Sequence, residues 1–402
     1  MSVSSMTPPK SSQRGRPLKI GVVVPHIFMH CDILPRVIFS PGRLAIDLVN
    51  GLHDCGHDVT LFSPGPVDVR CHTITADLSL FQAELDRRGD SYVDLLRKHP
   101  MTFVTLARQV QAELISDAYQ RANTGEFDIV HMYTNEEEIG YAFARLCRVP
   151  VVFTHHDPFN FLVRYKSIMP RYRHLNWISI SHAQRLTMPS DTHWVGNVYH
   201  GLNEPKLTPV KKPSREYAAY LGRIIQPKGV HLAIAAVRKY NETATTPLTL
   251  KIAGKHYAES GKDNYWKTMI EPELDDTIQY VGFIDTPGRK RDFLGNARAL
   301  LVPSLFDEPF GMVTLEAFAC GTPVIALDSG ALPEVIDDGV TGYVVHKGDA
   351  PYDEMMIVNQ LAGKLSQVDH IKRQSCLAAY RQQFTSRHMV QNYIDIYRSV
   401  IF

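Results

Sequence analysis

Short apolar runs alternate with amphipathic segments along the chain from residue 18 onward. The first run, LKIGVVV at 18–24, is continuously apolar, as is typical of a strand that is buried on both faces. Residues 43–56 follow with apolar positions at helical spacing, and DVTLF at 58–62 is a second apolar run. This alternation predicts an α/β domain built on a parallel sheet.

The alternation continues to about residue 204. Residues 82–122 predict one or two amphipathic helices, and residues 137–147 predict another. Further strands are expected at 128–133, 150–155, 178–181 and 198–201. We therefore predict an N-terminal Rossmann-like domain over residues 18–204.

A change in composition separates this domain from a second one. Prolines and charged residues without hydrophobic periodicity predict a linker over 205–216. A C-terminal Rossmann-like domain is expected over 217–385, with helices near 230–240, 287–296 and 312–320 and strands at 218–222, 248–254, 278–283, 298–304, 323–327 and 342–345. The predicted fold class is α/β, with two doubly wound domains facing an interdomain cleft.

Composition is compatible with this fold and excludes some classes of partner. The 402 residues are enough for two domains of about 100–200 residues each. The net charge is only +1, so the charge balance gives no reason to expect nucleic acid as a partner. Six cysteines without a CxxC pair indicate reduced thiols, and residues 1–17 predict a disordered tail without the apolar segment of a signal peptide. We expect a cytoplasmic protein.

Cations follow the first strand of the second domain. Gly222 and Arg223 come directly after the strand at 218–222, and Lys228 lies at the entrance to the next helix. In open parallel sheets, ligands bind beyond the carboxyl ends of the strands, and free N–H groups at a helix N-terminus attract anions. The arrangement suits a diphosphate, although two solvated surface charges are the alternative.

A second cluster lies in the stretch DEPFGMVTLEAFACG at 307–321. Glu308 precedes Pro309, which restrains the backbone, and Gly311, which permits a close approach to a ligand. The N–H groups of Met312 and Val313 then open a helix. Such a loop presents one carboxylate and several backbone donors to a ligand with hydroxyls and phosphate, whereas the alternative for Glu308 is an acid that favours the helix dipole.

Glu316 stands on the same helix among apolar residues. A carboxylate buried there without a partner would cost several kcal/mol or would stay protonated. The 2′,3′-diol of a ribose offers two O–H donors that match this acceptor. The alternative is a structural salt bridge to an arginine.

The two glutamates also carry a family resemblance. Their spacing resembles the E-x7-E signature of retaining glycosyltransferases of family four, also called glycosyl transferases group 1, which have GT-B architecture. Further segments resemble the family in the family's order, among them KIGVVVP, FDIVHMYT, VPVVFTHHDP, WISISHAQR, YLGRIIQPKGVHLAI and EPFGMVTLEAFACGTPVIALDSGALPEVIDDGVTGYVV. The likeness extends over about 330 residues.

The resemblance implies roles for the matching residues. The donor-binding residues would be Gly222, Arg223, Lys228, Glu308, Phe310, Gly311, Met312, Val313 and Glu316. Arg223 and Lys228 would bind the diphosphate and stabilise the leaving nucleotide, while Glu308 would hold sugar hydroxyls and Glu316 the ribose. The catalytic set would be completed by His156 of THHD, near the reacting sugar, with His155 as the alternative and a strand-end structural histidine as the simpler interpretation.

Three regions depart from the family or leave alternatives open. Family members usually carry a Gly-Gly pair after the first strand, but this chain has only Gly42, a candidate acceptor or phosphate loop. The basic stretch at 164–174 is expected to be a solvated helix face, and peripheral membrane contact is the less favoured alternative. The helix predicted at 386–402 would cross back to the N-terminal domain by resemblance, or else belong to the second domain.

The predicted function is the retaining transfer of a hexose from a nucleotide diphosphate sugar to an unidentified acceptor hydroxyl on a sugar, a small molecule or a lipid-linked group. A UDP-sugar is the favoured donor, and GDP-mannose is next. We expect no cofactor. The chain has no D-x-D sequence, so a metal-bound diphosphate is not suggested, and the resemblance to GT-B enzymes also implies that no metal is needed. A sugar phosphorylase, a nucleotide-sugar epimerase and an inactive nucleotide-sugar-binding protein are the alternatives.

Overall fold

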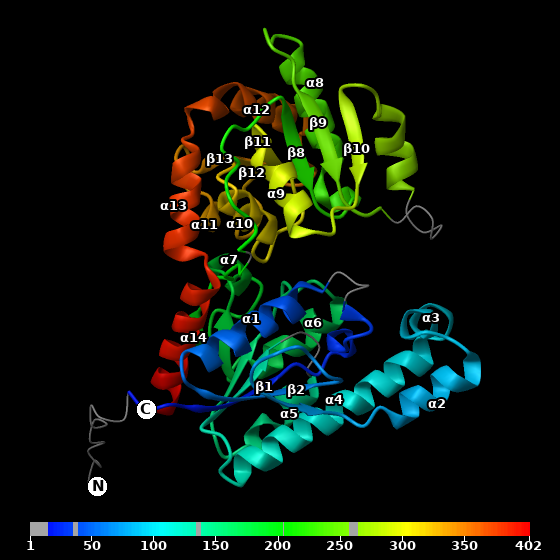
Figure 1. Cartoon of the computed structure of the whole chain (residues 1–402), viewed down its shortest axis with the longest axis vertical. Helices are drawn as coiled ribbons and strands as arrows, with labels where there is room; N and C mark the ends of the chain where they lie inside the picture. Colours follow the sequence, from blue (N-terminus) through cyan, green and yellow to red (C-terminus); the bar gives the residue numbers. More distant parts are fainter. Residues whose placement is uncertain (1–14, 35–38, 134–137, 204, 257–263) are drawn as a thin grey trace. The chain divides into compact units, whose positions relative to one another are not determined.

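The structure is a computed structural model that describes residues 15–34, 39–133, 138–203, 205–256 and 264–402. Within these residues the chain forms two compact units (Figure 1). The first unit contains the chain up to Ile180 together with Arg185–Val198 and Ser386–Phe402. The second contains Ser181–Gln184 and Tyr199–Thr385.

The first unit is built on a sheet of seven parallel strands. These are β1 Lys19–Val23, β2 Asp58–Ser63, β3 His72–Thr75, β4 Ile129–Tyr133, β5 Val151–Thr154, β6 Asn176–Ser179 and β7 Trp194–Asn197. Their order in the sheet is β3-β2-β1-β4-β5-β6-β7. The order reverses between β1 and β4, as in a doubly wound Rossmann-like sheet.

Helices cover both faces of this sheet. The first unit's helices are α1 Ser40–Asp54, α2 Ser79–Arg88, α3 Tyr92–Lys98, α4 Pro100–Asn123, α5 Glu138–Phe143, α6 Val163–Ile168 and α14 Ser386–Ile401. The four-residue helix α7, His182–Arg185, lies between β6 and β7 in the sequence, and its first three residues belong to the second unit. Figure 1 shows α1 and α14 on one face and α4 and α5 on the other. The buried core between α4 and the sheet includes Phe103, Leu114 and Phe127.

The helix α14 packs closely on α1 and β7 of the first unit. A Cβ added at Gly51 of α1 would lie 2.5 Å from Val390 Cγ2, and one added at Gly196 of β7 would lie 2.2 Å from Ile396 Cδ1. Both separations are far below van der Waals contact, so only glycine allows the helix to lie this close. The last helix of the chain is thereby part of the first unit's core.

The second unit has a sheet of six parallel strands. These are β8 Tyr217–Leu221, β9 Thr249–Ala253, β10 Ile278–Gly282, β11 Ala299–Val302, β12 Val324–Leu327 and β13 Gly342–Val345, in the order β10-β9-β8-β11-β12-β13. Its helices are α8 Val230–Asn241, α9 Pro287–Gly295, α10 Met312–Ala319, α11 Leu332–Val335, α12 Glu354–Gln367 and α13 Arg373–Gln383, and Gln226–Lys228 forms a 3₁₀ turn. Helix α8 packs against α12, β8 and β9, and α10 packs against α9, α13 and β12.

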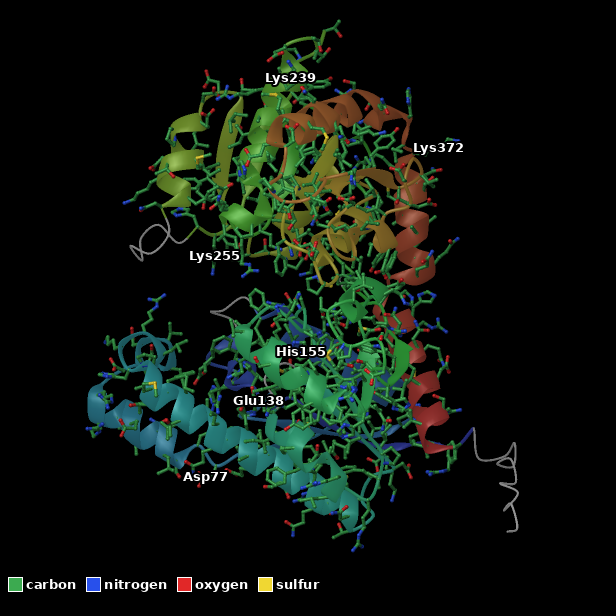
Figure 2. All side chains as sticks on the ribbon, turned by 180° about the vertical axis from the view of Figure 1, so that it is seen from behind. Asp77, Glu138, His155, Lys239, Lys255 and Lys372 are labelled. Atoms are coloured by element: carbon green, nitrogen blue, oxygen red, sulfur yellow. The ribbon has the colours of Figure 1, made fainter. Side chains whose placement is uncertain are left out.

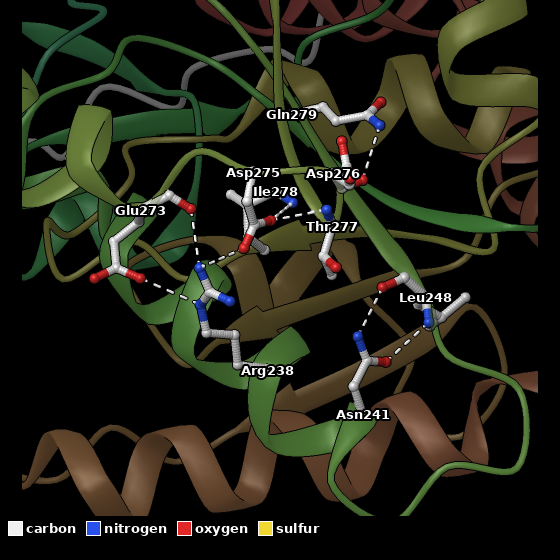
Figure 3. A network of polar contacts seen from close by, with 9 residues as sticks. All are labelled: Arg238, Asn241, Leu248, Glu273, Asp275, Asp276, Thr277, Ile278 and Gln279. Atoms are coloured by element: carbon white, nitrogen blue, oxygen red, sulfur yellow. Dashed lines mark hydrogen bonds and ion pairs between the residues drawn. The ribbon is translucent and has the colours of Figure 1, made fainter.

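A polar network fixes the far end of α8 (Figure 3). Arg238 donates to the Glu273 carboxylate at 3.2 Å and to Asp275 at 3.1 Å, just before β10. Asn241 donates to the Leu248 carbonyl at 2.9 Å and accepts from the Leu248 N–H at 2.8 Å. These bonds hold α8 to the chain before β9 and β10, so the opposite end of the helix has a fixed place.

The structure corrects several sequence predictions of secondary structure. The strand predicted at 198–201 is wrong, since the seventh strand is Trp194–Asn197. The strand at His72–Thr75 was not predicted, and residues 82–122 fall within three helices instead of one or two. No helix in the described part of the chain has the length and apolar character needed to cross a membrane.

Candidate active site

The predicted donor residues lie at the point where the order of strands reverses in the second sheet. Strand β8 pairs with β9 on one side and with β11 on the other. Residues 222–228 follow β8, and residues 303–311 follow β11. Figure 2 labels Lys255, just past β9 at this edge of the sheet, and Lys239 near the end of α8 at the opposite edge. Ligands of doubly wound sheets bind at such a reversal, outside the carboxyl ends of the strands.

Backbone contacts join these two loops. The N–H groups of Leu305 and Phe306 donate to the Pro227 carbonyl at 2.9 and 3.1 Å. Gly229 has φ +69°, and a Cβ added there would lie 1.9 Å from the Pro303 carbonyl oxygen. Because any other side chain would collide at this position, glycine is what lets the start of α8 touch the loop after β11.

Lys228 and Glu308 form an ion pair between the two loops. The Lys228 Nζ donates to Glu308 Oε1, and the two side chains are only 17% and 10% exposed. The Lys228 ammonium also lies 5.3 Å from the centroid of the Phe306 ring. The structure therefore brings together two residues that stand 80 positions apart in the sequence.

The backbone of Glu308 is fixed from the other side by the turn before α11. Gly330 has φ +59°, and a Cβ added there would lie 2.2 Å from the Glu308 carbonyl oxygen. The Ala331 N–H donates to the same oxygen at 2.8 Å. Contacts on both its side chain and its peptide group thus determine where the Glu308 carboxylate points.

The start of α10 presents backbone N–H groups. Gly311, the residue before the helix, has φ +94° and gives it no side-chain cap. No acceptor for the N–H groups of Met312 and Val313 is found among the residues that the structure describes. The Phe310 side chain is buried and lies 4.9 Å from the His200 ring and 5.9 Å from the Tyr199 ring, centroid to centroid. Two uncapped donors at a helix N-terminus form a site for an anion.

The start of α8 differs. It also begins after a glycine in the left-handed region, Gly229. However, the His231 N–H donates to the Tyr265 hydroxyl at 3.0 Å, and the same hydroxyl lies 2.7 Å from His231 Nδ1. One donor that the sequence offered to a diphosphate is therefore already bonded within the protein.

Arg223 and Gly222 lie beyond the end of β8. The Arg223 side chain is exposed, and no ion pair is found for it within the described part of the chain. Gly222 approaches Gly254 so closely that a Cβ added at Gly254 would lie 1.7 Å from the Gly222 carbonyl oxygen. Only a glycine at position 254 allows the two chain segments to approach this closely.

Glu316 has a partner that the sequence did not suggest. Lys290 of α9 donates to Glu316 Oε1 at 2.6 Å, and the two side chains are 26% and 14% exposed. The alternative expected from the sequence was an arginine, so the partner is a different cation. The basic run RKR at 289–291 was the signal for it, but spacing alone did not connect that run to α10.

His155 and His156 follow β5 in the first unit and have different surroundings. Burial lowers the pKa of His155, which is labelled in Figure 2, to about 3. Its ring lies 4.9 Å from the Phe159 ring and 5.0 Å from the Tyr165 ring, centroid to centroid. His156 is 6% exposed and packs edge-on against Tyr133 at 4.5 Å. His155 is thus a core residue among aromatic rings, and His156 is the better candidate for contact with a substrate.

Gly42 does not lie in a loop, and this corrects the expectation. It belongs to the first turn of α1 and is buried. A Cβ added there would lie 2.8 Å from the Phe39 ring and 3.0 Å from Leu34 Cδ1. Side-chain packing therefore accounts for this glycine, and part of the preceding segment, 35–38, is outside the described residues.

One group of potential metal ligands is found among the described residues, and it is not part of the predicted donor site. The ligand atoms of His30, Cys31 and Asp32 lie within 4.8 Å of one another. His30 Nδ1 already accepts the Asp32 N–H at 3.2 Å, and its ring packs 4.8 Å from that of Tyr92. These contacts within a local turn account for the short distances between the three side chains.

Each unit matches a known protein family. The family described as "Glycosyltransferase Family 4" matches residues 41–193, and the family described as "Glycosyl transferases group 1" matches residues 206–355. The chain is 33% identical over 205 residues to alpha-maltose-1-phosphate synthase of Mycobacterium tuberculosis, covering 47% of this chain and 49% of the relative. The chain thus spans about half the length of the curated relatives it matches.

Solved structures share the fold over nearly the whole chain. Sucrose-phosphate synthase from Thermosynechococcus elongatus has a TM-score of 0.69 and 17% identity, covering 94% of this chain and 98% of its own. Anabaena HepE in complex with UDP and glucose has a TM-score of 0.64 and 17% identity, with the same coverage. At these identities the likeness shows the fold alone.

Two units with parallel Rossmann-like sheets, and structural neighbours that match both, define a GT-B protein. With one family model matching each unit, the chain belongs to the glycosyl transferases group 1.

Proposed function

We propose that this protein is a retaining glycosyltransferase that moves a hexose from a nucleotide diphosphate sugar to an acceptor hydroxyl. One observation carries the proposal: at the strand reversal of the second sheet, Lys228 from the turn before α8 pairs with Glu308 of the loop that leads into the uncapped start of α10. A cation, a carboxylate and free N–H groups are what a sugar diphosphate needs from its site.

Each group has a separate task in this proposal. The N–H groups of Met312 and Val313 donate to the diphosphate oxygens, and Arg223 and Lys228 stabilise the negative charge that grows on the leaving nucleotide. Glu308 holds sugar hydroxyls through its carboxylate. The ion pair between Lys228 and Glu308 orients both side chains.

Glu316 binds the ribose diol, and Lys290 orients its carboxylate. We favour a UDP-sugar as the donor, with GDP-mannose next, and the HepE structure that holds UDP and glucose supports this choice of base. We keep His156 as a candidate catalytic residue. The transfer needs no metal in this proposal, because cations and helix N–H groups carry the phosphate charge, and we expect it to occur in the cytoplasm.

A thermal-shift panel tests the proposal. UDP, GDP, ADP and their sugars are added to the full chain, and the nucleotide sugars that raise the melting temperature are assayed for nucleotide release with and without EDTA. We expect UDP and a UDP-sugar to stabilise the protein and turnover to survive EDTA. If no nucleotide shifts the melting temperature at saturating concentration, the proposal is wrong.

Product analysis separates transfer from other reactions on the same fold. We expect the anomeric configuration of the transferred sugar, read by NMR, to equal that of the donor. A product whose formation depends on orthophosphate would indicate a phosphorylase, and an isomerised donor would indicate an epimerase. If the protein binds the nucleotide but shows no turnover with any acceptor, it is an inactive nucleotide-sugar-binding protein.

A further inference from the structure

A short segment of chain that lies between two stretches of the first unit belongs to the second unit. Ser181–Gln184 follows Ile180 and precedes Arg185, yet its contacts are with the second unit. The Glu334 carboxylate of α11 accepts the His182 N–H at 2.8 Å and the Ala183 N–H at 2.5 Å. Glu334 therefore anchors this segment by two charge-assisted hydrogen bonds.

Ser181 connects the anchored segment to the loop that carries Glu308. Its hydroxyl is fully buried, accepts the Gln184 N–H at 3.0 Å and donates to the Pro309 carbonyl at 2.8 Å. Because the bond from Gln184 uses an acceptor position, the hydroxyl proton is free to point at Pro309. The peptide that immediately follows Glu308 is thus held by a side chain.

A second connection runs from Glu334 to the next residue of the loop. The Tyr199 hydroxyl donates to Glu334 Oε2 at 2.9 Å. The Tyr199 ring in turn lies 5.9 Å from that of the buried Phe310. Glu334 is therefore connected to both Pro309 and Phe310, two of the three residues between Glu308 and the start of α10.

We propose that Glu334 is a positioning residue for the loop that carries Glu308. It acts through Ser181 on the Pro309 carbonyl and through Tyr199 on the Phe310 ring, and it thereby sets where the Glu308 carboxylate and the N–H groups of α10 meet the donor. The assignment rests on the proposed function of this loop. Both Glu334 oxygens accept bonds, so a glutamine would place an NH₂ group opposite a donor.

The test compares Glu334→Gln, Ser181→Ala and the double variant in the full chain. We expect each single variant to lower kcat about tenfold, as the loss of an oriented hydrogen bond in this network does, with the Kd for UDP within about twofold of the unchanged protein. The double variant should be little worse than Glu334→Gln alone, because Ser181 lies on a connection that Glu334 already anchors.

Asn241→Ala is the matched control, since Asn241 also makes two hydrogen bonds to the backbone of the second unit. It should lower the melting temperature to a similar extent and leave kcat within about twofold. If Glu334→Gln resembles this control, with a lower melting temperature and unchanged kcat, Glu334 only stabilises the fold and the proposal is overturned. The proposal is also overturned if the loss of kcat in the double variant equals the product of the losses in the two single variants.

Amide hydrogen exchange supplies a readout that does not depend on turnover. Ser181→Ala should raise the exchange rate of the peptide that covers Phe310 to Val313, while Asn241→Ala should leave it unchanged. If the unaltered protein binds no nucleotide and transfers no sugar, the proposed function fails, but this measurement still decides the positioning role. Unchanged exchange at Phe310 to Val313 in Ser181→Ala refutes that role.

Discussion

Helices α8 and α10 both begin at the strand reversal of the second sheet after similar glycines, but the N–H groups of their first turns differ in their hydrogen bonds. Each follows a glycine in the left-handed region, with φ +69° at Gly229 and +94° at Gly311, and neither glycine supplies a side-chain cap. At α8 the Tyr265 hydroxyl accepts the His231 N–H. At α10 the first N–H groups have no such partner among the described residues.

The difference shows that a helix N-terminus is a binding site only where the fold leaves its donors unpaired. Both helix starts lie beside charged residues in the sequence, so the sequence alone ranks them equally. At the start of α8 the His231 N–H is bonded within the protein and Lys228 pairs with Glu308, and in our proposal the start of α10 binds the diphosphate. We therefore expect variants around α10 to affect donor chemistry more than variants around α8.

Glu308→Ala should have the largest effect. Loss of a contact to the reacting sugar is expected to lower kcat by about two orders of magnitude or more, with a smaller change in nucleotide affinity. Steady-state kinetics together with calorimetry of UDP binding measure both quantities.

Asp307→Ala is its control, because the Asp307 side chain is 71% exposed and pairs with Lys347 at 2.7 Å. This variant should keep kcat within about twofold. Equal losses in the two variants would mean that the loop, and not the Glu308 carboxylate, is what matters.

Glu316→Ala should come next and should act on binding. Removing the acceptor of the ribose diol is expected to raise the Kd for UDP about tenfold or more, while kcat changes less. Lys290→Met, which removes only the partner, should weaken UDP binding to a smaller extent. If Glu316→Ala unfolds the protein and the fraction that remains folded binds UDP normally, the Lys290–Glu316 pair is structural.

Acid should act on the loop before α10 through His200. Burial lowers the pKa of His131, His155 and His200 to about 3 in the folded protein, against about 6.5 for an ordinary histidine. Below pH 6.5 these three histidines bind protons in the unfolded chain but remain neutral in the folded protein. The free energy of unfolding should therefore fall by about 1.4 kcal/mol per histidine for each pH unit between 6.5 and 3.

Urea unfolding at several pH values below 6.5 measures this slope. His200→Phe should reduce the slope by the contribution of one histidine, about 1.4 kcal/mol for each pH unit. Because the His200 ring packs against Phe310, this variant should also lower kcat. His174→Asn, at an exposed position, is the control. A slope that His200→Phe leaves unchanged would show that the ring is protonated in the folded state.

The sequence predicted most of the fold because parallel strands buried on both faces are continuously apolar. All six strands of the second sheet were expected close to their observed bounds, as in LTLKIAG for Thr249–Ala253. The exposed edge strand His72–Thr75 was missed, since HTIT carries no such run. The strand Trp194–Asn197 was placed too late for the same reason, because its residues are only half-buried.

Prediction of the site was limited by contacts between distant segments. The E-x7-E spacing marked Glu308 and Glu316, but it contains no information about Lys290, Tyr265 or Glu334. Each of these three makes its contact across 26 or more positions of the chain, which only the fold brings together. Gly42 was expected in a loop but lies in the first turn of α1, where the side chains of Phe39 and Leu34 pack around it.

Tyr265→Phe should have the smallest effect and tests the comparison most directly. The change removes the hydroxyl that accepts the His231 N–H and so leaves α8 with a free donor, as at α10. If the diphosphate binds at α10, the Kd for UDP should stay within about twofold, and the melting temperature should fall only as for one lost hydrogen bond. Tyr280→Phe, which loses a hydroxyl bonded to the Gly254 carbonyl at 2.9 Å, is the matched control for stability. A Kd for UDP that changes more than about fivefold in Tyr265→Phe alone would place the diphosphate at α8, because freeing one donor there would then have altered the phosphate site itself.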